Sequence, residues 1–94
     1  MHLSLEEQIR FERIVKYQDK INFQNLVQNE HMSLRLIEYL RQNGFEDKLT
    51  GYVMSFSRHM TLPFIKKHQF LDWNYFQVGY HMMFETNISQ IQLE

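Results

Sequence analysis

The amino-acid sequence predicts an all-α fold, a small helical bundle of about six short helices arranged as three helix-pair repeats. Three observations lead to this prediction. Apolar residues recur at intervals of three and four positions, residues that cap helices stand before these runs, and one stretch of the chain returns 28 positions later. Strict alternation of apolar and polar residues, which would favour strands, is confined to the last few positions.

The first expected helix runs from Leu5 to about Gln18. Ser4 and Glu7 match a capping box, in which each side chain accepts a hydrogen bond from the backbone N–H of the other residue. A second short helix is expected after Asn22, whose side chain can cap it. The apolar face of the first helix is predicted to consist of Leu5, Ile9, Phe11, Ile14 and Val15.

The third and fourth helices are expected in the middle of the chain. Ser33 caps the third helix, and Asn43–Gly44 ends it, because glycine adopts the left-handed conformation at little cost. Gly51 lies inside the fourth helix and weakens it by about 1 kcal/mol relative to alanine. The apolar stripe of this fourth helix is predicted to be Phe45, Leu49, Tyr52, Val53 and Phe56.

Two more helices complete the expected domain. Thr61 caps the fifth helix, with Pro63 tolerated in its first turn, and Asp72 caps the sixth. We expect one helical-repeat domain over residues 1–87 and a flexible C-terminal tail over residues 88–94, which could order against a partner. The stripe of the sixth helix is predicted to be Trp73, Phe76, Tyr80, Met83 and Phe84.

The repeated stretch explains how these helices are organised. "HMSLRLIEY", from His31, and "HMTLPFIKK", from His59, are identical at four of nine positions, and the same offset of 28 places Phe45 opposite Trp73. A second alignment, at an offset of 50, places Phe23 opposite Trp73 as well. Each aromatic residue therefore marks one helix pair, and three pairs are expected to stack so that each buries its apolar face against its neighbours.

The segments "FIKKHQFLDWNYF" and "IVKYQDKINFQNL…MSL" resemble the short helical repeats found in proteins of large DNA viruses and phages. The pattern of those repeats is Phe-Ile-x-Lys-x-x-Asp-x-(Asp/Asn)-Trp-x-x-Ile followed by Leu-Ser. The resemblance extends over residues 14–82 and departs in the middle unit, which is longer and has Gly44 where an acid or amide is usual. It implies an accessory viral or mobile-element protein that acts by binding, and it provides no catalytic residues.

The amino-acid composition excludes several classes of protein and chemistry. The 94 residues include 44% hydrophobic and 22% charged residues, enough for one core, and no cysteine, which excludes disulfides and thiolate chemistry. A net charge of −1 creates no overall field that would attract nucleic acid or an anionic membrane. No apolar run approaches the roughly 20 residues that span a bilayer. We expect a cytoplasmic protein, in the host cytoplasm if it is viral.

Catalytic and metal-binding patterns are weak. Three glycines form no phosphate-binding loop, and the acidic pairs Glu6/Glu7 and Glu46/Asp47 stand where helix N-termini favour negative charge. Three His-Met pairs would suit Cu(I), but they lie 28 and 22 residues apart at repeat junctions, so we expect them to cap or pack. The sequence therefore predicts no enzyme, no cofactor and no metal site.

The densest surface candidate lies in the C-terminal half, in "FIKKHQFLDWNYFQVGYH". Trp73 is expected in the core because of its helical spacing, whereas Tyr75 points away from the stripe, as interface tyrosines often do. Cations and aromatics together could also contact phosphates and stack on bases. The predicted partner-binding residues are Arg58, Lys66, Lys67, His68 and Tyr75.

These observations favour a non-catalytic protein-binding module. If the viral resemblance holds, the expected task is to inhibit or redirect a host protein complex, in defence or in transcription. The alternative is a small nucleic-acid-binding regulator that acts as a dimer. Apolar residues in the terminal repeats also predict that the end faces of the stack could form a homodimer.

Overall fold

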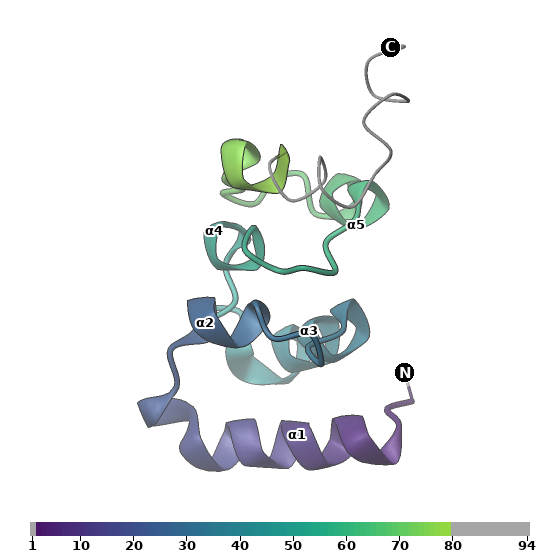
Figure 1. Ribbon diagram of the computed structural model, residues 1–94, viewed down its shortest axis with the longest axis vertical. Helices are drawn as coiled ribbons and strands as arrows, with labels where there is room; N and C mark the ends of the chain where they lie inside the picture. Colours follow the sequence, from purple (N-terminus) through teal and green to yellow (C-terminus); the bar gives the residue numbers. More distant parts are fainter. Residues whose placement is uncertain (1, 80–94) are drawn as a thin grey trace.

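The computed structural model describes residues 2–79, and within this range it contains helices and no strand, which confirms the predicted all-α bundle. In Figure 1 the chain rises from α1 at one end, through α2, α3 and α4, to α5 and a last helical stretch over residues 75–79. The named elements are α1 (Leu5–Tyr17), η1 (Gln18–Lys20), α2 (Phe23–Val27), α3 (Leu34–Leu40), η2 (Arg41–Phe45), α4 (Gly51–Met54) and α5 (Leu62–Lys67).

Side-chain caps divide the six helices of the described range into three pairs. Each pair opens with a helix capped by Ser or Thr and continues with a helix capped by Asn or Thr, so the predicted helix-pair arrangement is present. Each cap accepts a hydrogen bond from the backbone N–H three residues further along the chain. The six caps are Ser4, Asn22, Ser33, Thr50, Thr61 and Asn74.

The junctions between pairs also repeat at the offset of 28. The backbone N–H of His31 donates to Asn29 Oδ1 at 2.8 Å, and that of His59 donates to Ser57 Oγ at 3.2 Å. The imidazole Nε2 of His59 donates in turn to the backbone carbonyl of Glu30, which joins the two junctions. His31 and His59 thus form or link the turns between pairs, as expected for the first two His-Met pairs, and the third pair, His81–Met82, lies outside the described residues.

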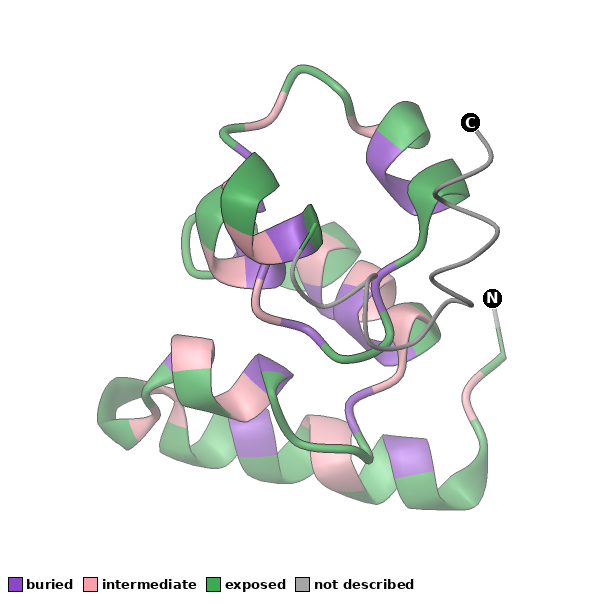
Figure 2. Cartoon of the chain, turned by 45° about the horizontal axis from the view of Figure 1, so that its top comes forward, coloured by how far each residue is buried: buried purple, intermediate pink, exposed green. Residues whose placement is uncertain are grey.

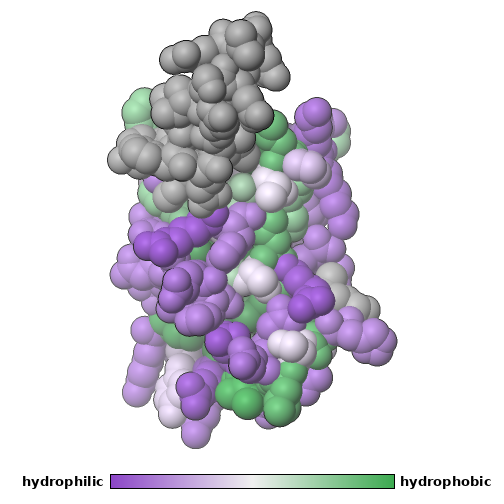
Figure 3. Space-filling model, turned by 45° about the vertical axis from the view of Figure 1, so that its right-hand side comes forward, coloured by the Kyte–Doolittle hydropathy of each residue, from purple (hydrophilic) through white to green (hydrophobic). Residues whose placement is uncertain are grey.

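Burial follows the inward faces of the stacked helices. In Figure 2 the buried positions lie mainly where one helix faces another, and exposed positions lie on the outside. Figure 3 shows one face of the molecule, on which hydrophilic side chains cover most of the described surface and hydrophobic ones appear between them. The fold therefore has one continuous interior, shared by all three pairs.

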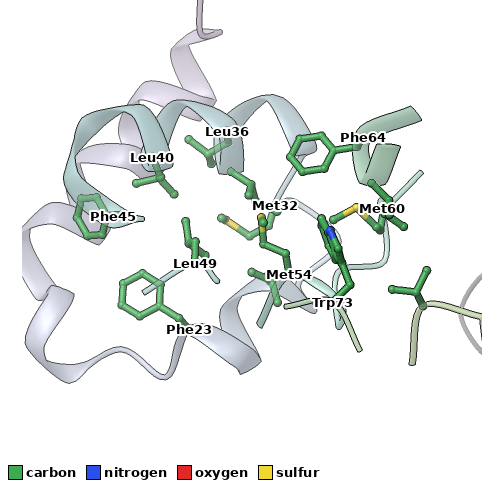
Figure 4. Close-up of a cluster of buried hydrophobic side chains, with 14 of the residues drawn as sticks. Phe23, Met32, Leu36, Leu40, Phe45, Leu49, Met54, Met60, Phe64 and Trp73 are labelled. Atoms are coloured by element: carbon green, nitrogen blue, oxygen red, sulfur yellow. The ribbon is translucent and has the colours of Figure 1, made fainter. Parts of the chain in front are cut away.

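That interior is one cluster of apolar side chains (Figure 4). The rings of Phe23 and Phe45 meet at one end, 5.9 Å apart, and Phe64 meets the buried Trp73 edge-on at 6.4 Å toward the other. All three repeat-marking aromatics are therefore buried in one cluster, as predicted. Between these two ends lie Met32, Leu36, Leu40, Leu49 and Met54.

The predicted fourth helix is wrong in its extent. Gly44 has φ of +98° and ends the preceding helix as expected, but Phe45 starts only a short turn. Thr50 is extended and caps a new helix, α4, which begins at Gly51. A Cβ on Gly51 would lie 2.8 Å from the backbone nitrogen of Asp72, so this glycine permits a close approach between two chain segments.

The predicted cap of the last helix is also wrong. Asn74, and not Asp72, caps residues 75–79 by accepting from Gln77 N at 3.1 Å. Asp72 Oδ1 instead accepts from Tyr52 N at 3.3 Å, so it caps the first turn of α4 from another part of the chain. Sequence spacing alone could not show this, because the contact depends on how the third pair packs on the second.

Three predicted apolar stripes are only partly buried, and in the stripe predicted for the fourth helix Tyr52 is 45% exposed. On α1, Ile14 is buried and Phe11 packs against the core, whereas Leu5, Ile9 and Val15 are exposed, since α1 has a neighbour on one side only. Phe76 is 83% exposed, and Val78 is buried in its place. Tyr80, Met83, Phe84 and the tail over residues 88–94 lie outside the described residues.

Candidate protein-binding cleft

A cleft of about 270 Å³ lies where the end of α3 meets the end of α5. The predicted residues Lys67 and His68 contribute to it from α5 and the turn that follows. The remaining lining comes from η2, from the turn that follows η2 and from the turn that follows α5. The lining residues are Arg41, Glu46, Lys67, His68, Phe70 and Leu71.

Buried aromatic residues hold His68 in this position. The residue ends α5, and its backbone carbonyl accepts a hydrogen bond from Trp73 Nε1 at 2.9 Å. Its imidazole ring lies 4.7 Å from the ring of Phe64, at an angle of 43°. Phe64 and Trp73 belong to the core, so the packing that closes the third helix pair also positions the backbone and the ring of His68.

Charges around the cleft favour neutral His68. Burial lowers the pKa of His68 below its usual 6.5, the positive charges of Arg41 and Lys67 lower it further, and Glu38 opposes them. Lys67 Nζ lies 3.0 Å from Glu38 Oε1, so its charge is partly compensated. Near neutral pH the cleft therefore presents a guanidinium group beside an uncharged imidazole.

Two nitrogen atoms of the cleft have unused hydrogen-bonding capacity. Arg41 Nε and His68 Nε2 are buried and have no hydrogen-bond partner among the described residues. Unpaired buried polar atoms are rare, because each costs about 1–3 kcal/mol. Both atoms are closed to solvent, so an incoming carboxylate pairs with them only after the Arg41 and His68 side chains turn toward the cleft, where a guanidinium binds a carboxylate with fixed geometry. Phe70 at the edge is 95% exposed and offers an apolar contact beside the polar one.

The five predicted partner-binding residues are not brought together. Lys67 and His68 line the cleft, and Lys66 is exposed on the same helix but outside the lining. Arg58 is exposed in the turn before α5, and Tyr75 is exposed in the last helical stretch, as predicted for an interface tyrosine, but neither lines the cleft.

The sequence analysis missed Arg41, Glu46, Phe70 and Leu71. Phe70 offered one usable signal, because it is a large aromatic between two expected helices and so lacks a helix partner to cover it. Arg41 offered none, since it follows the apolar run of α3 like any solvent-facing cation, and only the packing of α5 on α3 gives it a role.

In a second polar cluster, between α1 and α3, both carboxylate oxygens of Glu7 accept hydrogen bonds. Glu7 Oε1 accepts from Ser4 N and from Arg35 Nη2, both at 2.8 Å. Its Oε2 accepts from Ser33 Oγ at 2.8 Å and from Arg35 Nε at 3.3 Å. The hydrogen bond from the Ser4 backbone, more than any other cause, lowers the pKa of Glu7 to about 2, against the opposing effect of burial. This cluster joins two repeats and is a structural element.

Over residues 2–79 no three His, Asp or Glu side chains gather closely enough to hold a metal ion. In the same range no helix has the length and apolar character needed to cross a membrane.

Comparison with family models, with curated proteins and with solved structures gives no match to this chain. The resemblance to viral helical repeats therefore stays a prediction, and so does any function that it implies.

Proposed function

We propose that this protein is a non-catalytic protein-binding module that docks a partner segment in the cleft between α3 and α5. The observation that carries this proposal is the pair of buried, unpartnered nitrogens, Arg41 Nε and His68 Nε2, beside the exposed ring of Phe70. A partner that presents an Asp or Glu side chain next to an apolar one would satisfy the nitrogens and cover the ring.

The chemistry of the cleft favours a protein over nucleic acid. Lys67 is already paired with Glu38, and Glu46 also lines the cleft, so a chain of phosphates would meet negative charge as well as positive. A single carboxylate needs only one cationic partner, and the planar guanidinium of Arg41 can provide it. Following the viral resemblance, we assign the partner to a host complex that the protein inhibits or redirects, in defence or in transcription.

Affinity capture from the native host tests this proposal when it compares variants. The variant Arg41→Leu/Phe70→Ser removes the guanidinium group and the exposed ring. The control Lys20→Ala removes an exposed charge that does not line the cleft. We expect one host protein to bind the wild type and the control, to be lost by the cleft variant, and to stay bound as salt is raised.

Three outcomes would contradict the proposal. Binding that is equal in the cleft variant and the control would place the interface elsewhere. Capture that is sensitive to nuclease and falls steeply between roughly 50 and 200 mM salt would favour the nucleic-acid regulator instead. Absence of any specific host protein would exclude the host complex. Circular dichroism melting of each variant shows whether a loss of binding is a loss of fold.

A further inference from the structure

A groove of about 310 Å³ runs between α1 and α2 and shares no lining residue with the cleft. Its floor is apolar. Ile14 and Met32 are buried there, and Ile21 and Leu26 are partly buried against the same core. The volume lies within the roughly 300–1,000 Å³ typical of ligand sites. An apolar floor of this size at the surface is suited to receive apolar side chains from another molecule.

The rim of the groove is basic. Arg10 and Arg13 line it together with His31, whose Nε2 lies 3.6 Å from Oε1 of the exposed Glu30, and no acidic side chain lines the groove. Glu6 lies 3.8 Å from Arg10 as an exposed neighbour on α1, and Arg13 has no ion pair among the described residues. Arg10 and Arg13 are three positions apart on α1, so their side chains lie on adjacent turns of one helix face.

We propose that this groove docks an acidic amphipathic helix of a partner protein. Apolar side chains of that helix would occupy the floor formed by Ile14, Leu26 and Met32. Asp or Glu residues three or four positions apart on the helix would pair with Arg10 and Arg13, whose spacing is also one helical turn. Helix-in-groove docking of this kind combines an apolar face with charges along its edge.

Charge complementarity selects this occupant over others. Nucleic acid would use the cations but leave the apolar floor in contact with water, and a basic or neutral helix would leave the arginines unpaired. The groove is independent of the cleft, so the inference holds whether or not the cleft binds a carboxylate. A second copy of this chain is the remaining occupant, and the experiment distinguishes it.

Peptide display on the immobilised protein tests the proposal. Enriched peptides are then measured by fluorescence anisotropy against the wild type and two variants with the same change in net charge. The first, Arg10→Glu/Arg13→Glu, reverses the rim. The second, the remote variant Arg58→Glu/Lys66→Glu, reverses two exposed charges that line neither the groove nor the cleft. Melting curves of both variants are recorded first, and Tyr17→Ala, at an exposed rim position, provides a third test without any charge change.

We expect the enriched peptides to combine Leu or Phe with Asp or Glu at one-turn spacing. Their affinity should fall about 10-fold or more in the rim variant, several-fold in Tyr17→Ala, and by less than about 2-fold in the remote variant. The proposal would be overturned by the absence of enrichment, by enrichment of basic peptides, or by equal losses in both charge variants. It would equally be overturned by a dimer that the rim variant abolishes in sedimentation, since a second copy would then occupy the groove.

Discussion

Glu7 and His68 are both ionisable side chains near α3, but they differ in how far their polar atoms are hydrogen-bonded. Glu7 reaches α3 from α1, and both of its carboxylate oxygens accept hydrogen bonds, from the backbone of Ser4 and from the side chains of Ser33 and Arg35. His68 lies at the end of α5, and its Nε2 is buried without a partner in the described part of the chain. The hydrogen bonds of the Glu7 carboxylate are therefore made among the residues that the structure describes, whereas that of His68 Nε2 is not.

This difference indicates a structural role for Glu7 and a binding role for the cleft around His68. A fully paired carboxylate stabilises the contact between two helix pairs and leaves nothing for a ligand to bind. An unpaired buried nitrogen lowers stability, and a partner that supplies the missing acceptor recovers that free energy on binding. The Glu7 cluster should therefore affect stability strongly and binding little, whereas the cleft should do the reverse.

The largest effect is expected for the residue that supports the cleft from inside. Trp73 is buried, and its Nε1 donates to the His68 carbonyl. Trp73→Ala should lower the free energy of unfolding by about 3–5 kcal/mol, enough to unfold much of a marginal domain. Chemical denaturation measures this, with the exposed Tyr75→Ala as control. A Trp73→Ala variant that keeps its stability but loses its partner would show that Trp73 is an interface residue.

A smaller loss in the free energy of unfolding is expected when the carboxylate of Glu7 is removed. Glu7→Ala removes the acceptor for Ser4, Ser33 and Arg35, and it should cost roughly 2–3 kcal/mol because the first two donors are left partly buried. The neighbouring Glu6→Ala removes an exposed carboxylate with one loose ion pair and should change stability by less than about 0.5 kcal/mol. Equal effects of the two substitutions in urea denaturation would remove the contrast on which this interpretation rests.

Features of the fold that depend on residues close together in the chain could be predicted from the sequence. Helix caps such as Ser4, Ser33 and Thr61 depend on residues three positions apart, so they could be identified directly. The predicted Gly44 stop and the buried Trp73 follow from backbone conformation and helical spacing in the same way.

Features that depend on packing between repeats could not be predicted. Asp72 reads as the cap of the next helix, but it lies against α4, where Gly51 lets the chain approach. Glu7 was expected only in a capping box, and its contact with Arg35 appears once α3 packs on α1. The cleft also needs α3 and α5 together, so from sequence only Lys67 and His68 could be named, without Arg41.

Acid titration tests the Glu7 cluster without a change of residue. The folded pKa of Glu7 is lowered from 4.5 to about 2, so its stabilising contribution is fully present above about pH 4.5 and is lost as pH falls toward 2. Arg35 is 56% exposed, and solvent screening limits the expected loss to about 1–2 kcal/mol. Glu7→Gln should show a correspondingly smaller loss over this range, and an unchanged pH dependence would contradict the assignment.

The smallest effect is expected at His68, and its sign is the most informative. His68→Leu removes the unpaired Nε2 while keeping an apolar contact with Phe64, so the free energy of unfolding should stay unchanged or rise by up to about 1 kcal/mol. Because the folded pKa of His68 is lowered, the wild type loses stability as pH falls below about 6.5, and the variant should lose less.

Binding at the cleft should depend on pH in the opposite direction. A bound carboxylate would raise the pKa of His68 because it favours the protonated imidazole. It would act in the same direction as Glu38 and against Arg41 and Lys67. An acidic partner segment should therefore bind more tightly at pH 6 than at pH 7.5, and His68→Leu should abolish that dependence while leaving the fold intact. Calorimetry at both pH values would detect the proton taken up on binding. Affinity that is independent of pH in the wild type would show that His68 Nε2 is not the group that the partner completes.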